Sequence, residues 1–128
     1  MKILVIDDEL PIQRLFEQRF RYEISRGNLE LIFARSGEEA LTKLPDASVV
    51  LILSDINMPG MSGLELLRQI RILYPQRPPA VVMITAYSDE QKRRQAALYG
   101  ADDFLTKPLN FTLLRDRLTD YTTPIKTP

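Results

Sequence analysis

Residues 49–67 read VVLILSDINMPGMSGLELL, and they join a strand to a helix. Val49 to Leu53 is an unbroken apolar run, which is typical of a strand that helices cover on both faces of a parallel sheet. Ser62 to Glu65 has the pattern of a capping box, so a helix is expected to begin there and to end before Pro75. The stretch therefore predicts a strand followed by a helix, with Asp55 at the carboxyl end of the strand.

The same strand-then-helix pattern recurs along the chain. Capping-box patterns also begin at Ser36 and Ser88, and Pro11 suits the first turn of a helix whose apolar face reaches Phe20. Gly100 suits the end of the fourth helix. The chain thus predicts five helices, the last from about Asn110 to Tyr121, and five strands, at residues 3–6, 29–34, 49–53, 80–84 and 104–105. This alternation predicts an α/β fold with a doubly wound parallel sheet.

Composition excludes several classes of protein. The 128 residues suit one domain, expected over residues 1–121, and residues 122–128 (TTPIKTP) are expected to form a tail or the start of a linker. Without Cys or His, the chain has no thiol nucleophile, no histidine base and no His/Cys zinc site. Equal numbers of acidic and basic residues, 17 of each, predict no general attraction to nucleic acid or to an anionic membrane. The longest apolar runs have five residues and the amino terminus soon turns acidic, so we expect a cytoplasmic protein.

Polar residues follow four of the five predicted strands. Asp7 and Asp8 come after the first strand, Asp55 after the third, Thr85 after the fourth and Lys107 after the fifth. The carboxyl ends of parallel strands meet at one edge of the sheet, so these side chains are expected to lie together. Three crowded carboxylates repel one another unless a cation lies between them, and Mg²⁺ prefers such oxygen ligands.

This set of residues suits phosphoryl transfer. A carboxylate can act as the nucleophile that accepts a phosphoryl group, and Asp55 is the best candidate because it stands alone at the end of the central strand. The Asp7 and Asp8 pair is better suited to the metal. Lys107 and Thr85 would supply a positive charge and a hydroxyl to the phosphoryl oxygens, which removes the need for a histidine base.

The chain resembles the receiver domains of two-component response regulators, the chemotaxis-regulator-like receivers of bacterial signalling. The resemblance covers about residues 2–121, and four segments carry it in the right order: LVIDDE, SDINMPGMSGLELL, ITAYSD and GADDFLTKPLN. It implies the flavodoxin-like strand order 2-1-3-4-5. It also implies that a histidine kinase or a histidine phosphotransfer protein phosphorylates Asp55.

The resemblance implies further roles for named residues. Mg²⁺ would be held by the side chains of Asp8 and Asp55, the backbone carbonyl of Asn57 and, through water, Asp7. Lys107 would contact the phosphoryl group, its peptide bond to Pro108 would be cis, and Thr85 would form a switch pair with Phe104. The helix after Ser88, the fifth strand and the last helix would then form the signalling surface.

The resemblance also implies partners. They are an output domain, in the same chain or separate, and a second copy of the chain in a phosphorylation-dependent homodimer. The domain itself would bind neither nucleic acid nor a membrane. It would be a switch, with no enzymatic activity beyond its own phosphoryl transfer and autodephosphorylation. The chain departs from many relatives in having Phe104 in place of Tyr, and residues 111–113 lack the acidic residue of receivers that dimerise through charges on this surface.

Other interpretations remain open at this stage. A receiver that docks without being phosphorylated would have the same fold, and a small Mg²⁺-dependent aspartyl phosphatase or a flavin-binding domain would share parts of the pattern. Taken alone, Phe104 is an ordinary core aromatic, and Lys92 to Arg94 is most simply the solvated face of a helix.

Overall fold

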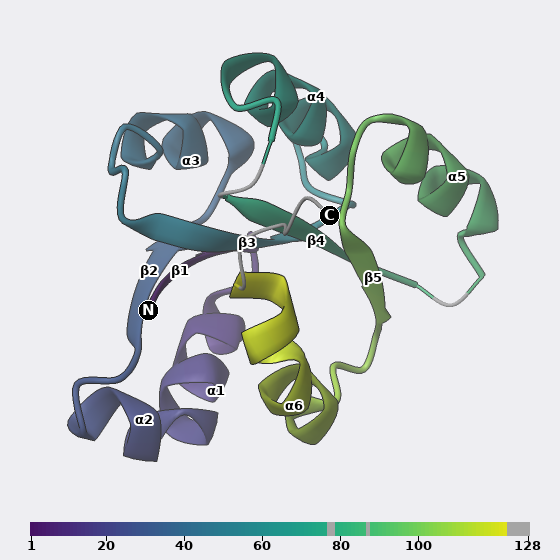
Figure 1. The fold of residues 1–128 in the computed structure, drawn as a ribbon. Helices are drawn as coiled ribbons and strands as arrows, with labels where there is room; N and C mark the ends of the chain where they lie inside the picture. The colour runs from purple at the N-terminus through teal and green to yellow at the C-terminus, as the bar shows by residue number, and fades with distance from the viewer. Residues whose placement is uncertain (77–78, 87, 123–128) are drawn as a thin grey trace, which may run out of the picture.

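The computed structural model describes residues 1–76, 79–86 and 88–122. Its sheet has five parallel strands in the order β2-β1-β3-β4-β5, which confirms the predicted fold and strand order (Figure 1). The strands are β1 (Lys2–Ile6), β2 (Glu30–Ala34), β3 (Val49–Asp55), β4 (Ala80–Thr85) and β5 (Asp103–Thr106). The predicted tail, residues 122–128, lies outside the described residues apart from Thr122, which ends the last helix.

The five predicted helices are present, and the described residues add a short sixth one, α2. The helices are α1 (Leu10–Arg19), α2 (Arg21–Ser25), α3 (Gly37–Lys43), α4 (Gly63–Leu73), α5 (Glu90–Leu98) and α6 (Phe111–Thr122). The chain leaves helical geometry at Phe20, where φ is −107° and ψ is 18°. Phe20 is buried, whereas α2 buries no side chain, so the apolar periodicity that predicts α1 stops before α2.

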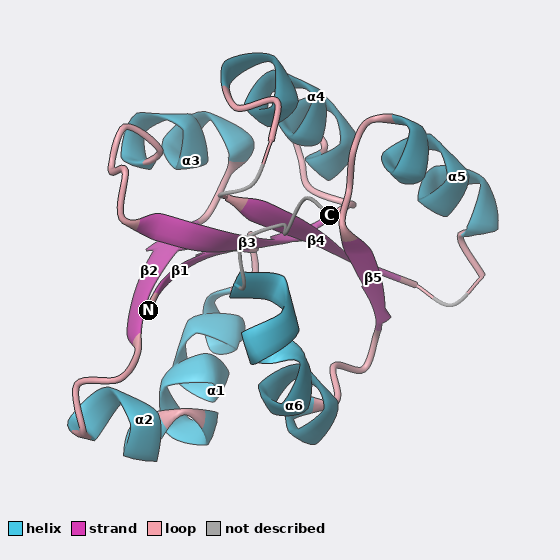
Figure 2. Ribbon diagram, in the orientation of Figure 1, coloured by secondary structure: helices cyan, strands magenta, loops and turns pink. Residues whose placement is uncertain are grey.

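Helices cover both faces of the sheet, as the unbroken apolar strands predict (Figure 2). Successive side chains along each strand point to opposite faces of the sheet, so the strands contribute to two separate cores. One core packs against α1 and α6 and includes the ring cluster of Phe16, Phe20 and Phe111, with centroids 5.1–6.0 Å apart. The other packs against α3, α4 and α5.

Side-chain capping bonds lie at the starts of three helices, two of them at predicted capping serines, and the third predicted cap is absent. Ser36 accepts a hydrogen bond from Glu39 N at 3.0 Å, and Ser62 accepts one from Glu65 N at 3.2 Å. Asn110 accepts one from the backbone N–H of the third residue of α6, at 3.0 Å. The capping box expected at Ser88 is wrong, because α5 begins at Glu90 and its N-cap residue, Asp89, makes no side-chain capping bond.

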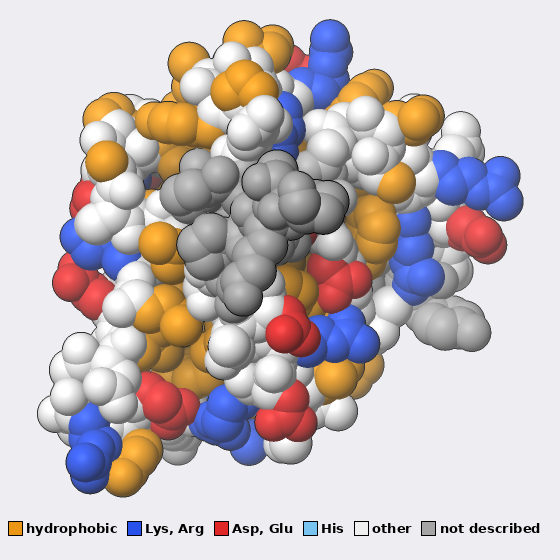
Figure 3. Space-filling model, viewed as in Figure 1, with side chains coloured by type: hydrophobic (Ala, Val, Ile, Leu, Met, Phe, Trp, Pro, Cys, Tyr) orange, Lys and Arg blue, Asp and Glu red, His pale blue; other side chains and the backbone are white. Residues whose placement is uncertain are grey.

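The surface carries charges of both signs. Figure 3 shows acidic and basic side chains interspersed over the face it views, as the balanced composition predicts. No helix among the described residues is long and apolar enough to cross a membrane.

Candidate phosphorylation and metal site

The carboxyl edge of the sheet brings the predicted site residues together. Asp55 is the last residue of β3 and Thr85 is the last residue of β4, so both strands run further than their apolar runs suggest. The ladder explains the extension, because Asp55 is the register partner of Ile84 and Thr85 is the partner of Thr106. Asp7 follows β1 directly, and Lys107 follows β5.

The carboxylates of Asp7, Asp8 and Asp55 form a tight cluster. One oxygen of each lies within 4.8 Å of the others, and Asp7 and Asp55 are buried. Burial, with a contribution from the negative charge of Asp55, raises the pKa of Asp7 to about 6, although a hydrogen bond from Glu9 N acts in the opposite direction. Ionisation of the Asp7 carboxyl group therefore costs free energy unless a cation lies nearby. A set of carboxylate oxygens with no nitrogen or sulfur donor fits a hard divalent cation such as Mg²⁺.

Asp55 is held by two donors. Lys107 Nζ donates to its Oδ2 at 2.8 Å, and the backbone N–H of Asn57 donates to its Oδ1 at 3.1 Å. Burial alone would lower the pKa of Lys107, but the hydrogen bond to Asp55 and the nearby carboxylates raise it. The Lys107–Pro108 peptide bond is cis, as predicted, and the backbone N–H of Lys107 donates to Thr85 O at 3.0 Å.

The predicted switch pair lies on one face of the sheet. Thr85 is fully buried, and its Oγ1 donates to Ala86 O at 3.4 Å. Phe104 is half-buried and packs against the core under α3, α4 and α5. Its register partner, Met83, is two residues before Thr85, so Thr85 and Phe104 project from neighbouring strands to the same side.

Gly63 fixes the start of α4 close to Asp55. Its N–H donates to Ile56 O at 2.8 Å, and a Cβ at this position would lie 2.2 Å from the backbone oxygen of Asp55. No other residue type fits without moving the backbone on one side or the other. The first residue of α4 is therefore in direct contact with the residue proposed as phosphoacceptor.

Lys92, in the first turn of α5, also reaches this site. Its Nζ donates to Oδ1 of Asn57, two residues after Asp55. The sequence predicts a solvated lysine here, and nothing in its local sequence distinguishes it from Arg93 and Arg94. The contact joins residues 35 positions apart and depends on how α5 packs, so no local pattern could have found it.

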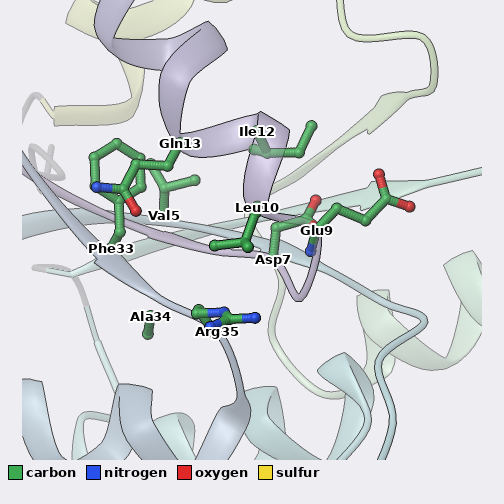
Figure 4. Close-up of a pocket in the computed structure, with 9 residues that line it drawn as sticks. All are labelled: Val5, Asp7, Glu9, Leu10, Ile12, Gln13, Phe33, Ala34 and Arg35. Atoms are coloured by element: carbon green, nitrogen blue, oxygen red, sulfur yellow. The ribbon is translucent and has the colours of Figure 1, made fainter.

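The cavity in Figure 4 lies beside Asp7, between the start of α1 and the end of β2. Its volume is about 10 Å³, which is room for about one water molecule. This cavity cannot hold an organic cofactor such as a flavin.

The chain is similar to one family of known proteins. Residues 3–119 match the family described as response regulator receiver domain. The chain is 39% identical over 109 residues to the transcriptional regulatory protein ResD of Bacillus subtilis, which covers 85% of this chain and 42% of that protein. The chain therefore spans less than half of that relative.

Two solved structures are similar over nearly the whole chain. One is the co-crystal structure of the Saccharomyces cerevisiae histidine phosphotransfer protein Ypd1 with the receiver domain of the response regulator Ssk1. It has a TM-score of 0.83 and 26% identity over 95% of this chain and 88% of that chain. The other is the response regulator TrrA from Thermotoga maritima in complex with Mg²⁺ and BeF, with a TM-score of 0.75 and 32% identity over 94% of this chain and 97% of that chain.

Proposed function

The chain belongs to the response regulator receiver domain family, and from this membership we propose that Asp55 accepts a phosphoryl group from a phosphohistidine. Receiver domains act as phosphorylation-controlled switches. The observation that carries the proposal is the buried Asp55 carboxylate, 2.8 Å from the Lys107 ammonium and clustered with Asp7 and Asp8. A carboxylate that is already ionised needs no general base to attack phosphorus.

The transfer has a simple balance of bonds. An oxygen of the Asp55 carboxylate forms a bond to phosphorus as the bond between phosphorus and the histidine nitrogen breaks, and the nitrogen keeps the electron pair. Hydrolysis restores the free carboxylate, because water attacks phosphorus and the Asp55 carboxylate leaves. We assign the chain no enzymatic activity beyond these two steps.

Magnesium is the proposed cofactor. The side chains of Asp8 and Asp55 and the backbone carbonyl of Asn57 would hold the ion, and Asp7 would reach it through water. A bound Mg²⁺ neutralises charge on the phosphoryl oxygens. The all-oxygen donor set and the raised pKa of Asp7 support this assignment.

Three residues respond to the phosphorylation of Asp55, and two of them, Thr85 and Phe104, transmit the change to the surface. Lys107 gives up its carboxylate partner and pairs with a phosphoryl oxygen, and Thr85 donates its hydroxyl to another. Movement of the Thr85 hydroxyl frees space into which Phe104 turns inward. The surface formed by α5, β5 and α6 then differs between the two states. The shared face of Thr85 and Phe104 supports this route.

The proposed phosphodonor is a histidine kinase or a histidine phosphotransfer protein. The similar Ssk1 receiver domain was crystallised with a histidine phosphotransfer protein, which supports this choice. This chain covers 42% of its relative ResD, so we propose that an output domain, attached or separate, responds to the phosphorylation of this domain. A phosphorylation-dependent homodimer is a further proposal, with no surface assigned to it because residues 111–113 lack the acidic residue of receivers that dimerise through charges on the last helix. We assign the domain no nucleic acid or membrane binding.

Intact mass spectrometry tests the phosphoacceptor. The chain is incubated with Mg²⁺ and acetyl phosphate, beside Asp55→Asn and a Mg²⁺-free sample. Asp116→Asn, an exposed carboxylate on α6, is the matched control. We expect one phosphoryl adduct in the wild type and in Asp116→Asn, and none in Asp55→Asn or without Mg²⁺. An absent adduct, under conditions in which a known receiver reacts, would favour a docking receiver that works without phosphorylation.

A further inference from the structure

Lys92 joins the first turn of α5 to the loop that follows Asp55. Its Nζ donates to Asn57 Oδ1, and the backbone N–H of Asn57 donates to Asp55 Oδ1 at 3.1 Å. Asn57 thus connects the Lys92 ammonium to the phosphoacceptor carboxylate through two hydrogen bonds. It comes from a helix, whereas Lys107 comes from the loop after β5.

The present partners of Lys92 hold it weakly. Asn57 offers a neutral amide oxygen, and a charged partner, the carboxylate of the N-cap residue Asp89, lies 3.6 Å away. The Lys92 side chain is 40% exposed, and exposed pairs of this kind contribute about 1 kcal/mol or less. A stronger acceptor placed nearby would therefore take this ammonium from Asn57.

Phosphorylation of Asp55 would create such an acceptor. A phosphoryl group carries about −1.5 to −2 charges and three acceptor oxygens. The bond from the Lys92 ammonium to Asn57 has one charged member, whereas a bond to a phosphoryl oxygen would have two and would add the attraction of opposite charges. We propose that Lys92 is a second lysine of the phosphorylation site, which bonds Asn57 in the resting state and a phosphoryl oxygen once Asp55 is modified. This inference rests on the phosphoacceptor role proposed above.

The helix that carries Lys92 is suited to follow it. Ala96 is the one buried residue of α5, and Asp89 makes no side-chain capping bond. A change of partner at Lys92 would therefore move the first turn of α5 at small cost to the core. This route to the signalling surface is separate from the one through Thr85, which starts from the end of β4.

The positive charge of Lys92 should affect the binding of a cation and the binding of an anion at this site in opposite directions. An ammonium near the site repels Mg²⁺ but attracts an anion bound at Asp55. Loss of the ammonium should leave Mg²⁺ affinity unchanged or slightly higher, and should weaken the binding of a phosphoryl analogue. A purely structural role for Lys92 would change both affinities in the same direction, or neither.

Isothermal titration calorimetry measures both affinities, with Mg²⁺ and beryllofluoride as the two probes. Mg²⁺ alone is titrated first, and beryllofluoride is then titrated at saturating Mg²⁺. The variants are Lys92→Met, the conservative Lys92→Arg, and the matched control Arg94→Met, which removes a cation from the exposed side of the same helix. We expect Lys92→Met to bind beryllofluoride about three- to tenfold more weakly. Lys92→Arg should retain most of the affinity and Arg94→Met all of it, with Mg²⁺ affinity no lower in any of the three.

Hydrogen exchange gives a second readout. Beryllofluoride should increase the protection of the first turn of α5 in the wild type and in Arg94→Met, but not in Lys92→Met. Equal beryllofluoride affinity and equal protection in Lys92→Met and Arg94→Met would overturn the role of Lys92. A wild type that binds no beryllofluoride in the presence of Mg²⁺ would instead overturn the proposed function itself, so the two failures are distinguishable.

Discussion

Helices α4 and α5 lie on the same face of the sheet but are attached to it very differently (Figure 1). Four residues of α4 are buried: Gly63, Leu66, Leu67 and Ile70. In α5 only Ala96 is buried. Ser62 caps α4 with a side-chain hydrogen bond, whereas no such bond holds the start of α5. We infer that α4 is the framework that holds Asp55 in place and that α5 is the element free to respond.

The difference has a direct energetic meaning. Complete burial of one leucine side chain stabilises a fold by about 1.5–3 kcal/mol, and α4 buries two leucines and an isoleucine. Alanine offers much less apolar area, so α5 gains little from the core. A switch needs an element of this second kind, because its two states must differ by only a few kcal/mol.

The same leucine substitution in the two helices should have very different effects. Leu67 is fully buried and Leu98 is 84% exposed. We expect Leu67→Ala to lower the free energy of unfolding by about 2–5 kcal/mol, because it leaves a cavity, and Leu98→Ala to change it by about 0.5 kcal/mol or less. Urea unfolding followed by circular dichroism measures both. Similar losses from the two variants would contradict the comparison.

The first helical residues form a second matched pair. A Cβ on Gly63 would lie 2.2 Å from Asp55 O and 2.7 Å from Ile56 Cα, whereas the Glu90 side chain is 75% exposed. Gly63→Ala should destabilise the fold by about 1–3 kcal/mol and slow the phosphorylation of Asp55, because α4 and the end of β3 must move apart. Glu90→Ala should do neither. Phosphorylation rates by intact mass, with urea unfolding beside them, decide this; an unimpaired Gly63→Ala would refute the close contact.

Native-state hydrogen exchange compares the helices without mutation. Elements with few buried contacts open locally at lower free energy than the core does. We expect amides of α5 to exchange at least about tenfold faster than those of α4, which corresponds to about 1.4 kcal/mol in opening free energy. The comparison would fail if both helices exchanged at the same rate through global unfolding.

The capping residues should give the smallest difference. Ser62→Ala removes a side-chain capping bond and should cost about 1 kcal/mol, whereas Asp89→Ala removes no such bond and should cost about half of that or less. Urea unfolding again provides the measurement, with Ser62→Thr as the conservative control that keeps a capping hydroxyl. A loss in Asp89→Ala as large as that in Ser62→Ala would show a capping role that the structure lacks.

Local patterns predict most of the fold. Apolar runs identify every strand, and capping serines identify the starts of α3 and α4. The pattern fails where local signals compete, as at Ser88, which resembles Ser62 in sequence although the helix begins two residues later. Strand ends are also missed, because polar residues such as Asp55 join the ladder only through their neighbours in the sheet.

The candidate site also contains residues that the sequence predicts and one that it does not. The sequence predicts the positions of five site residues because each lies at or just after the carboxyl end of a strand, and parallel strands end at one edge of the sheet: Asp7, Asp8, Asp55, Thr85 and Lys107. The contact of Lys107 with Asp55 agrees with that prediction. Lys92 is not predictable, since a lysine on a polar helix face is ordinarily a solvated residue.

By itself, the sequence determined the strand-and-helix alternation, the absence of thiol and histidine chemistry, and the convergence of three carboxylates and a lysine. These follow from periodicity, composition and the direction of parallel strands, which are properties of short segments. Only the tertiary structure decided that α4 is anchored and α5 is not, that Gly63 abuts Asp55, and that Lys92 reaches Asn57. The physical reason is that each of these depends on the packing distance between elements far apart in the chain, which no local pattern of residues encodes.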